Sequence, residues 1–200
     1  DMATKMVREY ETMIKSIEKY GGFYIGRYEL SGTVDNPTEK TGTTIIDKTW
    51  YELYNACKKI GGSDKEGIAT GMIWGCQWDA TCDFIATKGE QRSITSSSAW
   101  GNYENSEKKD TGSNEEWKAN NIYDIAGNCY EWTQEAISTS YRASRGGYGS
   151  NSGSNNPASG RYGSIPTSSS NDDLRFSSHF NNYYWNLERG ATSVALFLCL

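Results

Sequence analysis

The sequence predicts a mixed α+β domain of short strands, two to three helices and much irregular structure. Several separate segments carry apolar residues at helical spacing, and short runs between them alternate as strands do. The chain also has 7 tryptophans and 14 tyrosines in 200 residues, which is more aromatic surface than a disordered chain carries. This length suits a single domain, which we expect to span residues 1–200.

The N-terminal segment predicts a helix followed by a strand. Thr4–Tyr20 places apolar residues on one helical face, at Met6, Val7, Tyr10, Met13, Ile14 and Ile17. Gly21 and Gly22 end this helix, because glycine readily adopts the left-handed backbone found at helix ends. The next run, Phe23–Leu30, alternates well enough to form a strand.

Two further helices are expected before the middle of the chain. The first covers Lys48–Ile60, with Asp47 or Thr49 as its N-terminal cap and a Gly-Gly pair at its end. The second covers about Cys76–Thr87, and its candidates for burial are Trp78, Cys82, Phe84 and Ile85. Both helices would contribute to the core of the domain.

Irregular structure and short strands are expected in the remainder. Residues 88–121 are polar and rich in Gly and Ser, which predicts a long surface loop held down by Trp100 and Trp117. Tyr130–Ile137 reads as a strand. The apolar run within Arg189–Leu198 predicts a closing strand.

Charge and hydropathy exclude several classes of protein. The net charge of −5 and a pI near 5.0 leave no basic stripe to neutralise phosphates, so we expect no binding of nucleic acid. No apolar run approaches the roughly 18 residues that a membrane span requires, so we expect no membrane insertion. The chain begins at Asp1 without a signal peptide, and we expect it to be the C-terminal part of a longer protein.

The cysteines do not form a metal-binding or disulfide pattern. Five cysteines are scattered without a CxxC pair, and the chain has a single histidine, His179. Structural zinc sites usually need four Cys or His ligands at close spacing, so zinc is not expected. Buried free thiols fit the irregular spacing best, although the sequence leaves room for one disulfide.

The composition of one segment is unusual. Residues 138–184 contain no Lys, Glu, Gln, Met, Trp or Cys, whereas all 12 lysines lie at or before Lys118. A solvated loop would readily accept Lys, Glu and Gln, so this is a selective depletion. Random replacement of the two adenines in AAC codons produces such a set, because these codons cannot reach Lys, Glu, Gln, Met or Trp. A flexible Ser/Gly/Asn-rich linker is the alternative explanation.

Two motifs resemble the formylglycine-generating-enzyme family. Asn121–Trp132 reads NIYDIAGNCYEW and Ser144–Gly147 reads SRGG, which is similar to the family pattern GN-x-x-EW followed by RGG. Weaker matches occur in the expected order, at FYIGRYE (23–29), KTWYELYNAC (48–57) and GCQWDATCDF (75–84). The resemblance covers most of residues 20–200 and implies the C-type-lectin-like fold of that family's subtype.

The family contains both enzymes and binding proteins, so the function has to be inferred from the residues of the site and not from the fold. The enzymes oxidise a cysteine with two active-site cysteines that lie shortly after RGG. Here no cysteine follows Gly147 until Cys199, so the thiol chemistry lacks its ligand and nucleophile. We therefore expect no enzymatic activity, with an oxidase homologue as the alternative.

The other branch of the resemblance consists of variable proteins diversified by retroelements. Ser144–Ser177 is similar to their variable region, with RGG, a Ser/Asn run, N-x-P-A-S-x-R, a proline and a late strand. The resemblance implies a display domain that binds a protein or glycan receptor on a target cell, from a phage tail (virion) or a bacterial surface. A homo-oligomer is a further expectation. An undiversified carbohydrate-binding lectin-like domain is the remaining alternative.

On this interpretation the chain divides into four parts. Residues 1–20 form the N-terminal helix, 21–137 the scaffold with Trp132 in its core, 138–188 the variable ligand-binding region and 189–200 the closing strand. Varied side chains must stay out of the core, and Tyr, Ser and Asn are typical of antibody paratopes. The candidate ligand-binding residues are Tyr148, Ser150, Asn151, Ser154, Asn155, Tyr162, Ser164, Ser168, Ser169, Ser170, Asn171, Asp172, Asn182, Tyr183 and Tyr184.

Several conspicuous residues have structural interpretations. Each tyrosine in that set could instead be a half-buried packing residue. Arg145 is expected to make a structural hydrogen-bond fork, while Gly146 and Gly147 permit a positive φ or a close backbone approach. No cofactor is expected, but family resemblance offers calcium as an alternative to a tight turn capped by Asp124 and Asn128. The calcium ligands would come from Asp124, Ile125, Gly127 and Cys129.

Overall fold

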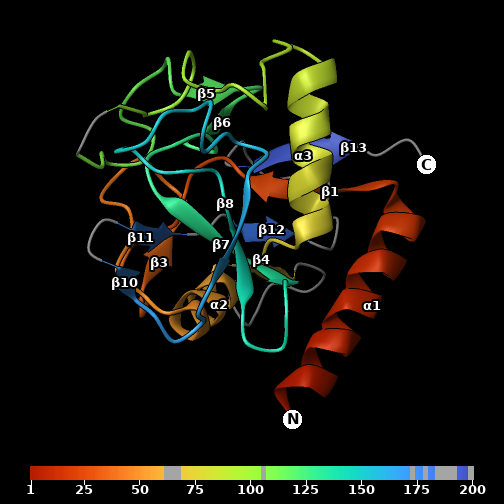
Figure 1. The fold of residues 1–200 in the computed structure, drawn as a ribbon. Coiled ribbons are helices and arrows are strands. Elements are labelled where there is room, and N and C mark those ends of the chain that lie inside the picture. The colour runs from red at the N-terminus through yellow and green to blue at the C-terminus, as the bar shows by residue number, and fades with distance from the viewer. Residues whose placement is uncertain (61–68, 105–106, 172–173, 178–179, 183–192, 198–200) are drawn as a thin grey trace.

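A computed structural model describes residues 1–60, 69–104, 107–171, 174–177, 180–182 and 193–197. Within these residues the chain forms the mixed α+β fold that the sequence predicts, with three helices and several small sheets (Figure 1). The strands are short, and long irregular segments connect them. None of the helices in this described part is long and apolar enough to cross a membrane.

Helix α1 (Met2–Tyr20) lies along the outside of the molecule (Figure 1). Asp1 caps its first turn by accepting a 2.8 Å hydrogen bond from the backbone nitrogen of Thr4. At the other end Gly21 takes a φ of 80°, so the predicted glycine stop is confirmed. Only the C-terminal half of the helix is buried against the body, through Met13, Ser16 and Ile17.

Helices α2 (Trp50–Lys59) and α3 (Gly75–Thr87) match the two other predicted helices to within two residues. Thr49, rather than Asp47, caps α2. Its hydroxyl accepts from the backbone of Glu52, whose carboxylate accepts from the backbone of Thr49. The Gly-Gly stop predicted for α2 lies outside the described residues.

One sheet has four antiparallel strands in the order β13 (Ser193–Phe197), β1 (Gly22–Gly26), β12 (Phe180–Asn182) and β4 (Thr70–Met72). The strand expected over 23–30 therefore ends early, at Gly26. Beyond it, backbone nitrogens bond to side chains instead of a neighbouring strand: Arg27 donates to Glu39, and Glu29 donates to Thr111. The expected late strand is present as β13, paired with β1 along all five residues.

The second sheet carries the candidate site. Its order is β10 (Ser170–Asn171), β11 (Leu174–Ser177), β7 (Tyr130–Ala136), β8 (Arg142–Arg145) and β9 (Arg161–Ser164). All neighbours are antiparallel except β11 and β7. Two ribbons complete the fold, β2 (Ser31–Gly32) with β3 (Pro37–Thr38) and β5 (Lys118–Ala119) with β6 (Ile122–Tyr123).

Two hydrophobic clusters form the core of the described part, and up to residue 169 Ala158 is their one buried member after residue 138. Trp78 and Trp100 belong to the first cluster, while Trp50 and Trp132 belong to the second. Trp132 is fully buried, which confirms its predicted core position. Of the two tryptophans expected to hold the long loop down, Trp100 is buried and Trp117 is half-buried.

The described cysteines are free thiols, as the irregular spacing suggested. Cys57, Cys82 and Cys129 are buried, whereas Cys76 is exposed on α3. Burial raises the pKa of the Cys82 thiol to about 12 and raises the pKa of the Cys129 thiol well above its usual value. These two thiols therefore stay protonated at neutral pH.

Candidate functional site

The candidate site lies at the β9 end of the second sheet. Strand β9 is the terminal strand in the described order, and the loop of residues 146–160 joins it to β8. In β9 exposed residues alternate with half-buried ones, as expected for a strand with one face on the body. The segment whose composition is unusual thus forms this loop and edge strand, and it also supplies β8 and β11 inside the same sheet, β10 at its other end and β12 inside the four-stranded sheet.

The RGG motif holds the start of this loop in place. The Arg145 side chain is fully buried, forms a short ion pair with Asp79 and lies with its guanidinium over the ring of Trp78. Gly146 and Gly147 have φ values of 85° and 79°. A Cβ atom on Gly147 would lie 2.1 Å from the carbonyl oxygen of Asn156, so only glycine fits there. The positive φ predicted for Gly146 and Gly147 is confirmed. Arg145 is structural but makes no hydrogen-bond fork, because only its Nη2 donates, to Asp79, while its Nε and Nη1 have no hydrogen-bond partner among the described residues.

Tyr103, which was not among the predicted site residues, holds both ends of the loop. Its buried hydroxyl lies 2.9 Å from the carbonyl oxygens of Gly146 and Asn156 and 3.1 Å from Oγ of Ser97. Burial raises the pKa of Tyr103, so the phenol remains a neutral hydrogen-bond donor at physiological pH. A tyrosine inside the polar 88–121 segment was the only sequence signal available.

The 93–98 segment supports the middle of the loop through hydrogen bonds. The backbone nitrogen of Ser97 donates to the carbonyl of Gly153 at 2.9 Å, and the nitrogen of Gly153 donates to Oγ of Ser98 at 2.8 Å. Oγ of Ser97 also accepts from the backbone nitrogen of Ala158 at 2.9 Å. These bonds satisfy backbone groups that would otherwise be buried without partners.

Three tyrosines meet beside the loop. The ring of Tyr130 on β7 lies 5.0 Å from that of Tyr148 and 5.1 Å from that of Tyr162, centroid to centroid. Nδ2 of Asn156 donates to the Tyr130 hydroxyl at 2.5 Å, and the Tyr162 hydroxyl donates to the carbonyl of Asn155 at 3.2 Å. Tyr130 is buried, while Tyr148 and Tyr162 are half-buried. Tyr130 was not among the predicted site residues.

Burial also sets the protonation of this tyrosine cluster. It raises the pKa of Tyr130 above the usual value for tyrosine, with a smaller contribution from the neighbouring phenols of Tyr162 and Tyr148. Burial raises the pKa of Tyr162 as well. Tyr130 and Tyr162 are therefore neutral near pH 7.

The predicted site residues differ in exposure. Three polar residues are exposed on the loop: Ser150, Ser154 and Asn155. Six are half-buried: Tyr148, Asn151, Tyr162, Ser164, Ser168 and Ser169. Strand positions are described for Ser170 and Asn171 on β10 and for Asn182 on β12, where it pairs with Tyr24 and Thr70. Asp172, Tyr183 and Tyr184 lie outside the described residues.

The loop of residues 124–129, for which calcium binding was an alternative, forms hydrogen bonds with other segments of the chain. The buried Asp124 carboxylate accepts from the Thr111 hydroxyl at 3.0 Å and the Gly112 nitrogen at 2.8 Å. Asn128 likewise bonds across to Asn102 and to the backbone of Lys109. The turn has positive φ values, and both side chains also bond to neighbouring segments of the chain. Among the residues described, no group of three His, Cys, Asp or Glu is placed to hold a metal ion.

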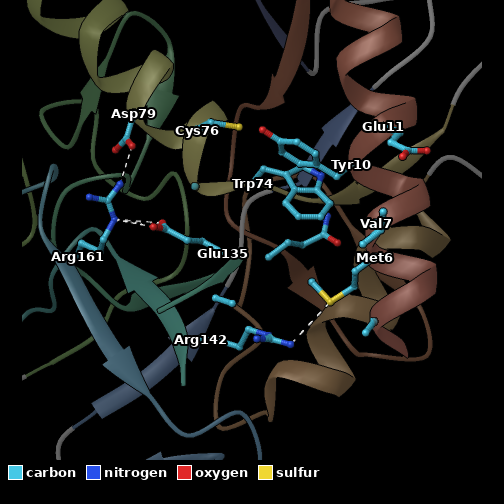
Figure 2. A pocket seen from close by; sticks show the side chains of 14 residues that line it. Met6, Val7, Tyr10, Glu11, Trp74, Cys76, Asp79, Glu135, Arg142 and Arg161 are labelled. Atoms are coloured by element: carbon cyan, nitrogen blue, oxygen red, sulfur yellow. Dashed lines mark hydrogen bonds and ion pairs between the residues drawn. The ribbon is translucent and has the colours of Figure 1, made fainter. Parts of the chain in front are cut away.

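A charged network borders the site on the other side of β9. Arg161 reaches two carboxylates, with Nε 2.9 Å from Glu135 and Nη2 2.6 Å from Asp79 (Figure 2). Both carboxylates also face the buried Arg145. Two cations and two anions thus neutralise one another where the edge strand meets α3.

The fold is similar to that of a solved variable protein. No family model matches the chain, and no curated protein sequence matches it. Among solved structures, Treponema denticola variable protein 1 superimposes with a TM-score of 0.52 at 16% identity. The match covers 78% of this chain and 84% of that chain. At this identity the likeness concerns the fold, and it extends over most of both molecules.

Proposed function

We propose that this chain is a ligand-binding display domain whose surface residues are diversified by a retroelement. The domain would use the C-type-lectin-like scaffold of the formylglycine-generating-enzyme subtype. Its partner would be a protein or glycan receptor on a cell surface, reached from a phage tail or a bacterial surface, with assembly of several copies of the chain as a further expectation.

One observation carries the proposal: in the described part after residue 138, buried anchors alternate with accessible polar positions. Arg145 and Asn156 are buried, whereas Ser150, Ser154 and Asn155 are exposed. Substitution is tolerated at exposed positions, whereas buried positions are sensitive to even one methylene. A diversified surface requires this separation. The structural likeness to a protein named as a variable protein supports the same proposal.

The chemistry of the exposed positions favours recognition of another molecule. Tyr148 and Tyr162 present rings that are half-accessible and supported from behind by Tyr130. Ser150, Ser154 and Asn155 surround them with small hydrogen-bonding groups. Tyrosine gives a large contact area with few rotatable bonds, and Ser and Asn adapt their hydrogen bonds, as in antibody paratopes.

The proposal includes the absence of thiol-oxidase activity. No cysteine follows the RGG motif before Cys199, and the nearest buried thiol to the loop is Cys82, which contacts the carbonyl of Ala158 at 3.8 Å. With its pKa raised to about 12, this thiol is a poor nucleophile and a poor copper ligand. Copper-dependent oxidation of a cysteine-containing peptide, lost in Cys82→Ala or Cys129→Ala, would contradict this part of the proposal.

The proposal is tested by a small library at Tyr148, Ser150, Ser154, Asn155 and Tyr162, with Asp, Ser and Tyr at each position. Folding is scored by thermal denaturation, and binding is scored separately on a glycan and cell-surface protein array. We expect most members to fold and their binding profiles to differ from one another. Sequencing the native locus should also find a near-copy of the 144–185 coding segment beside a reverse transcriptase gene.

A matched library on the scaffold provides the control. Exposed positions of α1 that lie away from the loop, such as Lys15 and Glu18, should alter neither folding nor the binding profile. If most loop variants unfold, the loop belongs to the core and the display proposal is wrong. If they fold and all bind alike, recognition resides elsewhere on the molecule.

A further inference from the structure

A groove of about 710 Å³ separates α1 from the second sheet, away from the tyrosine cluster (Figure 2). Met6, Val7 and Tyr10 of α1 form one side, and Trp74 lies at the base. Val7 is 57% exposed and Tyr10 is 41% exposed, so the N-terminal half of α1 leaves apolar surface uncovered. Small-molecule sites typically have volumes of about 300–1,000 Å³ and mainly apolar walls with a few polar groups.

Arg142 supplies an unpaired charge at one end of this groove. Among the described residues no carboxylate lies within ion-pair distance of its guanidinium, whose one hydrogen bond is a weak contact to the sulfur of Met6 at 3.8 Å. Its Nε is buried and has no hydrogen-bond partner there. The guanidinium also lies over the ring of Trp50, 5.3 Å from the centroid. A half-buried cation with free donors favours an anion.

The other charges along the groove do not compensate Arg142. Asp79 and Glu135 are occupied by Arg145 and Arg161 in the network described above. Glu11 follows Met6 by five residues, more than one helical turn along α1, and lies at the far end of the groove (Figure 2). The groove therefore offers apolar walls and one positive end.

We propose that this groove is a second binding site, for a small organic carboxylate with an apolar body. The carboxylate pairs with Arg142 in the bidentate geometry that guanidinium favours. The body lies against Val7, Tyr10 and Trp74. The groove includes Arg142 and Arg161 of the 138–188 segment but none of the predicted ligand-binding residues, and the proposal stands whether or not the proposed display function is correct.

Two probes with the same chain and opposite charge test the proposal: dodecanoate and dodecyltrimethylammonium, both below their micelle concentrations. Calorimetry measures their affinities for the full chain. Cys76 lines the groove and is an exposed thiol, so its alkylation by N-ethylmaleimide, followed by mass spectrometry, reports occupancy. We expect dodecanoate to bind at least about tenfold more tightly and to slow alkylation of Cys76, because charged hydrogen bonds contribute on that scale.

Three variants locate the effect. Arg142→Gln should reduce dodecanoate affinity about tenfold or more and bring it level with the cationic probe. Arg8→Gln removes an exposed cation of α1 that does not line the groove and should change neither affinity. Val7→Asp places a carboxylate on the groove wall at an exposed helical position, so it should fold normally and weaken dodecanoate binding even if Arg142→Gln does not fold.

Three results would overturn the proposal. Equal affinity of the two probes for the wild-type chain would show that the groove binds apolar chains without selecting for negative charge. Binding without protection of Cys76 would place the probe elsewhere. Self-association detected by sedimentation and abolished by Val7→Asp would show that a second copy of the chain covers this face.

Discussion

Asn155 and Asn156 are neighbours of the same residue type, and the fold uses them in opposite ways. Asn155 is exposed, and its backbone carbonyl accepts the Tyr162 hydroxyl. Asn156 is only 8% exposed, donates through Nδ2 to the Tyr130 hydroxyl and faces the Tyr103 hydroxyl with its carbonyl. The difference teaches that position relative to the scaffold, and not residue type, decides which residues of this segment are available to a ligand.

The same division extends through the whole 142–164 segment. Arg145, Gly147, Asn156 and Ala158 are buried and act as anchors, while Ser150, Ser154 and Asn155 between them are exposed. A mutational process that acts on the whole segment would therefore damage the fold whenever it reached an anchor. A diversified protein of this design needs its variable codons placed between the anchors, which sequencing of sibling genes can examine.

The largest expected effect on stability comes from truncating a core side chain of the scaffold that supports both the buried anchors and the exposed loop residues. Trp132→Ala should lower the free energy of unfolding by about 3–5 kcal/mol, because the ring is fully buried in the second core cluster. Tyr141→Ala is the matched control, since this aromatic residue is 42% exposed, and it should change stability by less than about 0.5 kcal/mol. Urea denaturation curves that coincide for Trp132→Ala and the wild type would contradict the core assignment.

A smaller effect is expected at an anchor defined by backbone shape. Gly147→Ala should destabilise the chain by about 1–3 kcal/mol, because alanine is strained at a φ of 79° and its Cβ would meet the Asn156 carbonyl. Gly163→Ala is the control. A Cβ there would make only ordinary contacts, the nearest at 3.6 Å to Ile137. Thermal unfolding that shows equal losses for both variants would remove the distinction between anchor and exposed strand.

These expectations also show where sequence reasoning succeeded. The three helices were predictable because periodicity and caps are local, as Thr49 and Glu52 at α2 illustrate. Composition marked the segment but did not predict its exposure, because residues such as Asn156 and Ala158 within it are buried against the scaffold. The early end of β1 was not predictable, since it depends on a bond from Glu29 to Thr111, 82 residues away. Tyr103 was missed likewise, because its partners Gly146 and Asn156 are 43 and 53 residues distant.

The smallest effect tests the comparison itself, within one pair of neighbours. Asn156→Ala should lower the free energy of unfolding by about 1–3 kcal/mol, because it leaves the buried Tyr130 hydroxyl without the amide that donates to it. Asn155→Ala should change stability by less than about 0.5 kcal/mol, since its side chain is exposed. Equilibrium denaturation of both variants measures this difference. If the two losses were equal, exposure would not separate anchors from display residues, and the half-buried tyrosines beside them would have to be counted as core.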